Sequence, residues 1–346
     1  MSSVRAQAHA AAAAAPRRPL ARLHGGDRGA GAGGAWDARR AALAVAIGLF
    51  AASMIYGAAS TPGFVTWDNA KAILASMGFV GIVAVGMTLI MLGGNLFSLS
   101  LGTTVAVTAM AFLSLLHLGL VVALLITLAL GLAICAAQGA VIGAFGANPI
   151  IVTIAAGALQ QGLTASLSNG HSVQPSAADG VYDVLVTPVL GIPFSVYVLL
   201  ALAIVVELVL RRSRFGRELY LVGENRRAAF AAGLSVTRVT TVAFALAGVC
   251  TAIAGVLIGA FNQNASLLLS GTYTYDAISA AIVGGNAIGG GRGSAARTLL
   301  GALVIATVGD LMLLRNYSTG AQILVKGLIV LVFVALLNAR APRGTR

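Results

Sequence analysis

Long apolar runs separated by short polar connections make up most of the chain from residue 41 onward. A helix of about 20 apolar residues is long enough to cross a bilayer. Ten runs approach or exceed that length, at Ala41–Ala59, Ala72–Leu92, Ser98–Leu116, Leu120–Phe145, Pro149–Leu167, Pro193–Leu210, Val239–Phe261, Tyr273–Ile288, Ala295–Leu314 and Ile323–Leu337. The pattern predicts an all-α polytopic membrane protein with about ten transmembrane helices.

Two of the joints between these runs are rich in glycine and resemble each other. One reads GGNLFSLSLG from Gly93 and the other reads GGNAIGGGRG from Gly284, so each has a Gly-Gly-Asn triplet and a further glycine seven residues after the Asn. The two joints are offset by 191 residues, and one interpretation is a parallel internal repeat, as transporters often have. Chance similarity is the alternative, because the chain contains 43 glycines. Either way, glycines inside or beside an apolar run predict broken helices.

The two ends of the chain differ from the apolar middle. Residues 1–40 are rich in Ala, Gly and Arg and offer little to bury, which predicts a disordered basic tail. The next run, Ala41–Ala59, has a second interpretation as a cleaved signal peptide, although the preceding tail is long for one. We expect a transmembrane domain over 41–338 and a second basic tail over 339–346.

Charge is scarce and unevenly placed. Only 9% of residues are charged, against about 25% in ordinary soluble domains, and the stretch from Ala72 to Ala178 has no Asp, Glu, Lys or Arg. A soluble fold could hardly cover its surface with that stretch. The net charge of +12 does not indicate nucleic acid binding, because the arginines gather before Ala41, in the loop 211–238 and after Asn338.

Arginines in short loops fix the orientation of a membrane protein, since such loops stay in the cytoplasm. An even number of crossings places all three basic segments on one side of the membrane. It places the polar segment Ser168–Gly191 on the other side. We therefore expect both termini and the loop 211–238 in the cytoplasm.

The search for catalytic, cofactor and metal-binding groups finds none. The chain has no G-x-x-x-x-G-K-[ST] motif, and Lys71 and Lys326 are its only lysines, so it cannot bind ATP through a P-loop of its own. No histidine has a partner at the spacing of metal ligands. Cys135 and Cys250 fall in apolar runs and are expected to be small core residues. We expect neither an enzyme nor a cofactor.

The stretch GENRRAAFAAGL, from Gly223 to Leu234, predicts a short cytoplasmic helix. Asn225 is a good N-cap, and Gly233 is a good residue to end the helix in the left-handed conformation. The helix is too short to cross a bilayer. It could be interfacial, with Arg226 and Arg227 at lipid headgroups. Its alanines bind lipid weakly, however, and favour close docking against another protein.

Three segments resemble the ribose-type ABC transporter permeases over about residues 69–338. The first is FGRELYLVGENRRAAFAAGL, the second YTYDAISAAIVGGNAIGGGRGS and the third VKGLIVLV, which includes Lys326. One feature departs from that family, which usually has Gly-Gly-Ile-Asp-Leu-Ser-Val-Gly after its second helix. Here Ser98 stands where the Asp is expected, so an acidic group is lost from that joint.

The resemblance implies the permease subunit of an importer in the bacterial inner membrane, moving a sugar or related small polar solute. It implies four partners: an ABC ATPase, a periplasmic or extracellular solute-binding protein, a second permease copy and membrane lipid. The outer face, including the loop 168–191 and the turns near Asn262–Gly271, would meet the binding protein. The residues expected to couple to the ATPase are Gly216, Arg217, Gly223, Asn225, Arg226, Arg227, Ala228, Ala229 and Gly233.

The alternatives are a branched-chain amino acid type ABC permease, a secondary transporter or channel, and, more remotely, an intramembrane enzyme. A secondary transporter would need ionisable groups at the midplane, and the long uncharged stretch counts against it. For the solute path the candidates are Asn95, Ser98, Gln160 and Asn286. An equal alternative for Asn95 and Asn286 is that each caps a half-helix.

Two charged residues interrupt the last two apolar runs. Asp310 and Lys326 are each eight residues from Ser318, which lies in the expected outer turn. They should therefore lie at nearly the same depth in an antiparallel hairpin. Because an unpaired charge in a membrane is costly, we predict a structural ion pair between them. The competing interpretation has Lys326 snorkelling outward and Asp310 facing a polar cavity.

Overall fold

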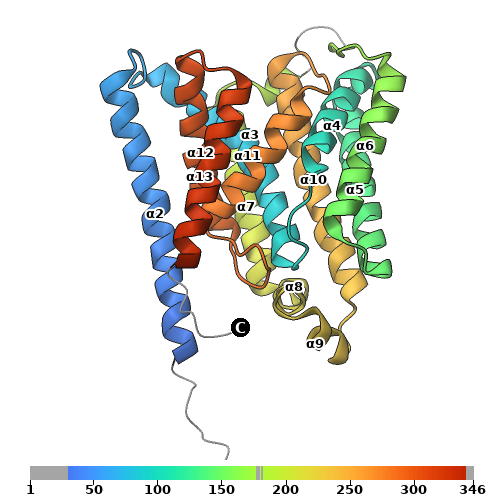
Figure 1. Cartoon of the computed structure of the whole chain (residues 1–346). Helices are drawn as coiled ribbons and strands as arrows, with labels where there is room; N and C mark the ends of the chain where they lie inside the picture. Colours follow the sequence, from blue (N-terminus) through green and yellow to red (C-terminus); the bar gives the residue numbers. More distant parts are fainter. Residues whose placement is uncertain (1–29, 177–179, 181, 340–346) are drawn as a thin grey trace, which may run out of the picture. The chain divides into compact units, whose positions relative to one another are not determined.

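The computed structural model describes residues 30–176, 180 and 182–339. The chain divides into two compact units, Met1–Asp37 and Ala38–Arg346, and the second contains the helical bundle. The described residues contain helices and two isolated backbone bridges but no strand (Figure 1). The α-helices are α2 (Ala30–Ser60), α3 (Trp67–Leu92), α4 (Leu101–Leu115), α5 (Leu120–Phe145), α6 (Pro149–Ser168), α7 (Phe194–Arg212), α8 (Arg214–Glu224), α9 (Arg226–Ala231), α10 (Val236–Asn262), α11 (Leu269–Val283), α12 (Ala295–Leu314) and α13 (Thr319–Ala339), with 3₁₀ turns η1 (Leu116–Leu118) and η2 (Asp183–Leu185).

The all-α polytopic membrane fold is confirmed. Each of the ten apolar runs overlaps a helix, although residues 98–100 and 284–288 of the expected runs are not helical. Eight helices of the described chain are long and apolar enough to cross a membrane. Of the other two, α11 has only 15 residues, and α13 has a shorter apolar stretch at Thr319–Ala335. Ten crossings and cytoplasmic termini stay predictions.

The largest boundary difference lies at the first apolar run. α2 begins at Ala30, so residues 30–40 of the expected disordered tail are helical. Four of the residues 30–40 are alanine, which has the highest helix propensity, and they oppose the unfavourable glycines at 31, 33 and 34. The remaining parts of the two expected tails, 1–29 and 340–346, lie outside the described residues.

The core of the bundle is built on α3 and α10. Every residue of α3 from Gly78 to Leu92 is buried, and α10 packs along α5, α4 and α3. Small residues allow such close packing, because helices in lipid associate by shape rather than by excluding water. Gly131 of α5 and Gly248 of α10 illustrate this, since a β-carbon at either would press on the carbonyl oxygen of the other.

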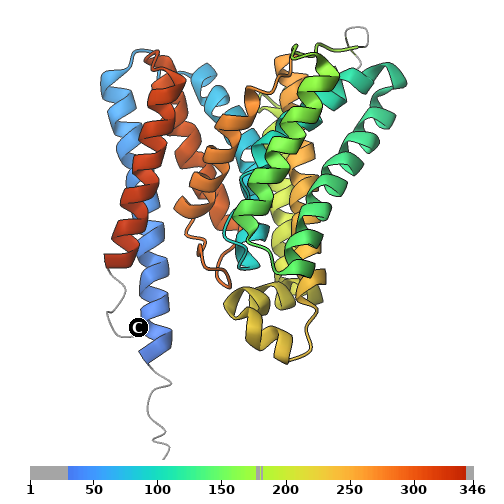
Figure 2. The same cartoon turned by 45° about the vertical axis from the view of Figure 1, so that its right-hand side comes forward.

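The short helices α8 and α9 lie at one end of the bundle. The Arg226 guanidinium donates to the carbonyl of Ile142 at 3.3 Å, near the end of α5. α6 and α10 start at this end and run to the other, where Val173 and Ala265 exchange backbone hydrogen bonds of 2.8 and 2.9 Å. Figure 2 shows α8 and α9 opposite that far end, which agrees with the expected separation of loops 211–238 and 168–191.

The predicted ion pair between Asp310 and Lys326 is wrong. Lys326 Nζ lies 2.7 and 2.9 Å from the carboxylate oxygens of Asp276 on α11, and both side chains are buried. Lys326 passes α12 at Gly309, where a β-carbon would lie 3.5 Å from Nζ. Asp310 is the next residue and points about 100° further round the helix. Equal depth in the bilayer was therefore not enough to predict a pair, because Lys326 faces the side of α12 that carries Gly309 and Asp310 points to another side.

Candidate functional site

The α9 helix has the caps that its sequence predicts. The Asn225 side chain accepts a hydrogen bond of 3.0 Å from the Ala228 N–H. At the other end Gly233 has a φ of +82°, and the N–H groups of Gly233 and Leu234 donate to the carbonyls of Phe230 and Ala229. This pair of bonds is a Schellman motif. A helix of six residues is thus held at both ends by its own sequence.

The outward surface of α9 consists of one large ring among small side chains. Phe230 is 74% exposed, and Ala228, Ala231 and Ala232 beside it are exposed as well. Ala229 is buried against the bundle. Small neighbours leave the Phe230 ring protruding, a shape that fits a cleft in a protein better than a flat lipid surface.

The α8 helix joins α7 to α9 and approaches the bundle closely. Its N-cap, Ser213, accepts a bond of 3.0 Å from the Gly216 N–H. Gly216 and Gly223 are both buried, and a β-carbon at either would overlap a carbonyl oxygen, that of Leu210 or that of Leu92. Arg217 lies on the exposed side of α8. Glycine is required at 216 and 223 because backbone fills the space of a side chain.

Three glycine-rich segments meet behind α8. We call the contact of Gly93–Gly94, Gly223 and Gly290–Gly291 the glycine junction. The Gly291 N–H donates to the Leu92 carbonyl at 3.0 Å. A β-carbon on Gly290 would lie 2.5 Å from Gly94 Cα, and one on Gly94 would lie 3.2 Å from Gly223 Cα. The end of α8 therefore touches both Gly-Gly-Asn joints without intervening side chains.

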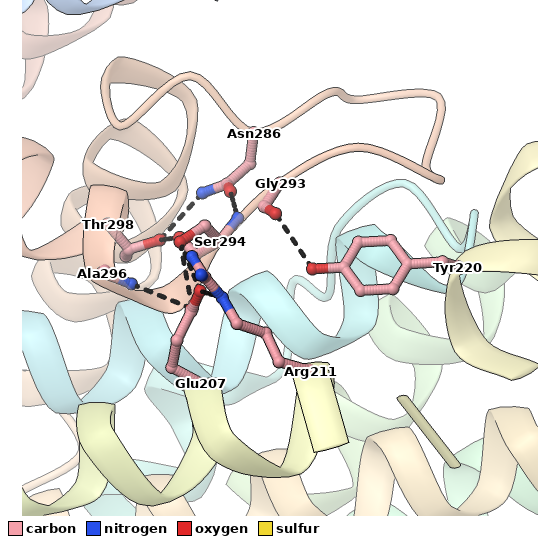
Figure 3. A network of polar contacts seen from close by, with 8 residues as sticks. All are labelled: Glu207, Arg211, Tyr220, Asn286, Gly293, Ser294, Ala296 and Thr298. Carbon is pink, nitrogen blue, oxygen red and sulfur yellow. Dashed lines mark hydrogen bonds and ion pairs between the residues drawn. The ribbon is translucent and has the colours of Figure 1, made fainter. Parts of the chain in front are cut away.

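Polar contacts tie the second joint to α7 and α8 (Figure 3). The Tyr220 hydroxyl donates to the Gly293 carbonyl at 3.0 Å. Glu207 on α7 accepts from the Ser294 hydroxyl at 3.0 and 3.1 Å and from the Ala296 N–H at 3.3 Å, and Arg211 Nε lies 2.6 Å from its carboxylate. Ser294 makes no capping bond with its own side chain, so Glu207 caps α12 from another helix.

Asn286 lies at the centre of this network, with all its polar atoms used. Its Nδ2 donates to the Ala281 carbonyl and the Thr298 hydroxyl, both at 2.8 Å, and its Oδ1 accepts from the Ser294 N–H at 2.8 Å. Asn286 is buried. These bonds favour the alternative in which it fixes the joint between two helices.

The other three candidates for the solute path take no part in this hydrogen-bond network. Asn95 is buried, and in the described part of the chain its side chain makes one long hydrogen bond of 3.3 Å, to the Gly93 carbonyl. Ser98 is buried beside Ser100, whose hydroxyl donates to Gln138. Gln160 on α6 accepts from Thr104 at 2.9 Å. Asn286 thus differs from the other three candidates in the hydrogen bonds that it makes.

The residues expected to couple to the ATPase form one continuous element, α8 and α9, whereas Glu207, Tyr220 and Ser294 were missed. A signal for Glu207 existed, because a carboxylate at the end of an apolar run needs a partner. Tyr220 gave no such signal, since its bond reaches a backbone carbonyl 73 residues away. In the described part of the chain no group of three His, Cys, Asp or Glu could hold a metal ion.

Comparisons with known proteins agree with this geometry. The family described as "Branched-chain amino acid transport system / permease component" matches residues 69–337. Probable ABC transporter permease protein YphD of Escherichia coli is 32% identical and covers 83% of this chain and 87% of its own. Ribose import permease protein RbsC of Bacillus subtilis is 28% identical (80% and 86%), and L-arabinose transport system permease protein AraH of Escherichia coli is 30% identical (83% and 87%). No solved structure matches the chain.

Proposed function

The chain belongs to the branched-chain amino acid transport system permease family, and we propose that it imports a sugar or a related small polar solute. It is a multi-pass protein of the bacterial inner membrane and the permease subunit of an ABC importer. Such an importer works with an ATPase and a solute-binding protein. Two points of the proposal need support: the class of solute, and the contact through which the ATPase drives transport.

A sugar is the better choice of solute than a branched-chain amino acid. The family description names amino acids, but relatives that cover more than four fifths of this chain are named for ribose, D-allose and L-arabinose import. The three remaining path candidates, Asn95, Ser98 and Gln160, are uncharged hydrogen-bonding groups. Such groups suit hydroxyls better than the ammonium and carboxylate of an amino acid.

The ATPase subunit binds α9 in this proposal. The observation that carries it is the exposed Phe230 ring on α9, which is capped at both ends and directly follows α8, whose end packs into the glycine junction. A cleft of the ATPase that moves on ATP binding would carry α9 with it. Gly223 would then pass the movement to both joints. The permease itself binds no ATP, and it forms its path with a second permease copy in surrounding lipid.

A change at Gly233 tests this role. A valine there is strained, because φ is +82° and a β-branched residue strongly disfavours positive φ. Gly233→Val should leave the importer in the membrane and hydrolysing ATP, yet lower solute uptake at least tenfold. Radiolabelled sugar uptake and phosphate release, measured on the same proteoliposomes, read the two separately.

Gly63 provides a matched control. Its φ is +83°, and, like Gly233, it has nothing within 4 Å of where a β-carbon would lie. Gly63→Val therefore introduces equal strain in the turn between α2 and α3, away from α9. Uptake should stay near that of the wild type. If both variants transport normally, or both fail equally, α9 has no special role in coupling.

A further inference from the structure

A groove lies between α7 and the first turns of α12, at the end of the bundle that carries α8 and α9. It has a volume of about 320 Å³, within the range of about 300–1,000 Å³ typical of small-molecule sites. Two alanines, Ala203 on α7 and Ala296 on α12, leave room between the helices because their side chains are short. The apolar lining of the groove consists of Ala203, Ile204, Leu208, Ala296 and Leu299.

The groove has the depth of one leaflet of a bilayer. Its lining on α7 runs from Ala203 to Arg212, which is about 14 Å of helix at a rise of about 1.5 Å per residue. Half of a hydrocarbon core of about 30 Å is about 15 Å. Ile204 and Leu208 are 68% and 56% exposed along that length. A molecule that fills the groove therefore needs an apolar part that is nearly as long as one leaflet is deep.

The charged side chains of the groove gather at its α8 end. The Glu207 carboxylate is already occupied by the Ser294 hydroxyl and by Arg211 Nε (Figure 3). Arg211 and Arg212 are both exposed, and among the described residues the Arg211 Nη groups and the whole Arg212 guanidinium have no hydrogen-bond partner. Guanidinium groups bind phosphate oxygens through paired N–H donors. With two guanidiniums against one carboxylate, this end of the groove suits an anion.

We propose that this groove binds an anionic phospholipid of the cytoplasmic leaflet. The phosphate lies between Arg211 and Arg212, and one acyl chain lies along Ile204 and Leu208. Basic pockets between membrane helices on the cytoplasmic side bind anionic headgroups, and the arginine distribution predicts that this end of the bundle faces the cytoplasm. A free phosphate would use the arginines alone, whereas a lipid uses the apolar length as well.

The bound lipid also stabilises the fold around the groove. Arg211 pairs with Glu207, and Glu207 caps α12 through Ser294 and the Ala296 N–H. A headgroup on Arg211 therefore holds a side chain that fixes the joint between α11 and α12. Because a ligand that binds the folded state raises its stability, the lipid should be detectable by thermal unfolding.

The test uses the complete importer in detergent, with phosphatidylglycerol, phosphatidylcholine or inorganic phosphate added. The readouts are the temperature at which half of the permease aggregates and the lipid retained in native mass spectrometry. Phosphatidylglycerol should raise that temperature by several degrees, and the other two additions should raise it little.

Two variants remove different parts of the site. Arg212→Gln removes one exposed guanidinium, and Ala296→Phe fills the groove but keeps the charges and the backbone N–H that Glu207 accepts. Each should reduce the phosphatidylglycerol shift by more than half and the retained phosphatidylglycerol at least threefold. The proposal is overturned if either variant responds to phosphatidylglycerol and retains it as the wild type does.

Arg238 supplies the matched control, because it is exposed at the start of α10, at the same end of the bundle, and does not line the groove. Arg238→Gln should keep the full shift and the retained lipid. If it loses as much as Arg212→Gln, a general attraction of arginines to headgroups explains the binding and the proposed site is wrong.

The other occupants of the groove are separate outcomes. If inorganic phosphate raises the aggregation temperature as much as phosphatidylglycerol, the site takes a free anion. If phosphatidylcholine does so, the arginines select nothing. If the permease alone retains phosphatidylglycerol but the complete importer does not, the groove is a contact with the ATPase. Each of these three results overturns the lipid site.

Discussion

The two Gly-Gly-Asn joints have the same local structure and different surroundings. Gly93 and Gly284 end α3 and α11, and their N–H groups donate four residues back, to Leu89 and Ala280. Gly94 and Gly285 follow with φ of +73° and +77°. The Gly-Gly-Asn triplet thus ends both helices in the same conformation. This agreement supports the internal repeat.

Beyond the triplet the joints diverge. Asn286 uses its amide fully and lies in a loop that Glu207 and Tyr220 hold from neighbouring helices. Asn95 has one long bond, and its Oδ1 is buried without a partner in the described part of the chain. The chain then runs without helix to Leu101. The second joint is therefore fixed by hydrogen bonds from neighbouring helices. In the first joint the Asn95 side-chain oxygen is still able to accept a hydrogen bond.

The helices that lead into the two joints, α3 and α11, differ in length and in charge. α3 is buried and has only apolar and small residues at the depth of Val85, which corresponds to Asp276 if the repeat holds. α11 is short and carries Asp276, which Lys326 holds from α13. The ion pair joins the short α11 to α13 inside the bundle. Substitutions at this ion pair should therefore affect the stability of the α11 side of the comparison most strongly.

The largest effect is expected at this ion pair. Asp276→Asn or Lys326→Met leaves one charge buried, which should destabilise the fold by about 3–5 kcal/mol. The double variant Asp276→Asn/Lys326→Met leaves no charge and should recover part of the loss. Yield of monodisperse protein and thermal unfolding in detergent measure both.

The exposed pair between Lys71 and Asp68 is the control. Asp68→Asn should change stability by less than about 1 kcal/mol, because surface pairs contribute little. If the losses at Asp276 and Lys326 simply add, the two residues do not act as a pair.

The sequence predicted local features well and pairings across helices poorly. The caps at Asn225 and Gly233 depend on residues within one turn, so they were predictable. The depth of Lys326 follows from counting residues, but its partner depends on the rotation of α12, where Gly309 rather than Asp310 faces it. The bonds of Glu207 and Tyr220 to the second joint also depend on packing between distant segments.

The next effect is expected at Asn286. Asn286→Ala removes the side-chain bonds to Ala281, Ser294 and Thr298. The buried Ser294 N–H loses its partner, whereas the Thr298 hydroxyl keeps its bond to Thr88, so we expect a cost of roughly 2–4 kcal/mol. Thermal unfolding of the purified permease measures it. Asn148→Ala, which removes one exposed capping bond at α6, should cost about 1 kcal/mol in the same assay. Equal losses would show that the network around Asn286 adds nothing.

The smallest effect on stability, and the sharpest contrast, is expected at Asn95. Asn95→Ala gives up one bond of 3.3 Å and removes a buried oxygen that lacks a partner, so the two contributions nearly cancel. We expect a change of less than about 1 kcal/mol in thermal unfolding. If Asn95 lines the path, sugar uptake should nevertheless fall several-fold, because a hydrogen bond to the moving solute is lost.

Cysteine labelling distinguishes the two asparagines directly. The native thiols of Cys135 and Cys250 are buried and should not react with the reagent. During turnover a small water-soluble thiol reagent should modify Asn95→Cys, because a group on the path meets water with each cycle. Asn286→Cys should resist the reagent, since its side chain fills a closed network. Equal labelling at both positions would mean that the joints move alike, and the difference in their hydrogen bonding would then have no consequence for transport.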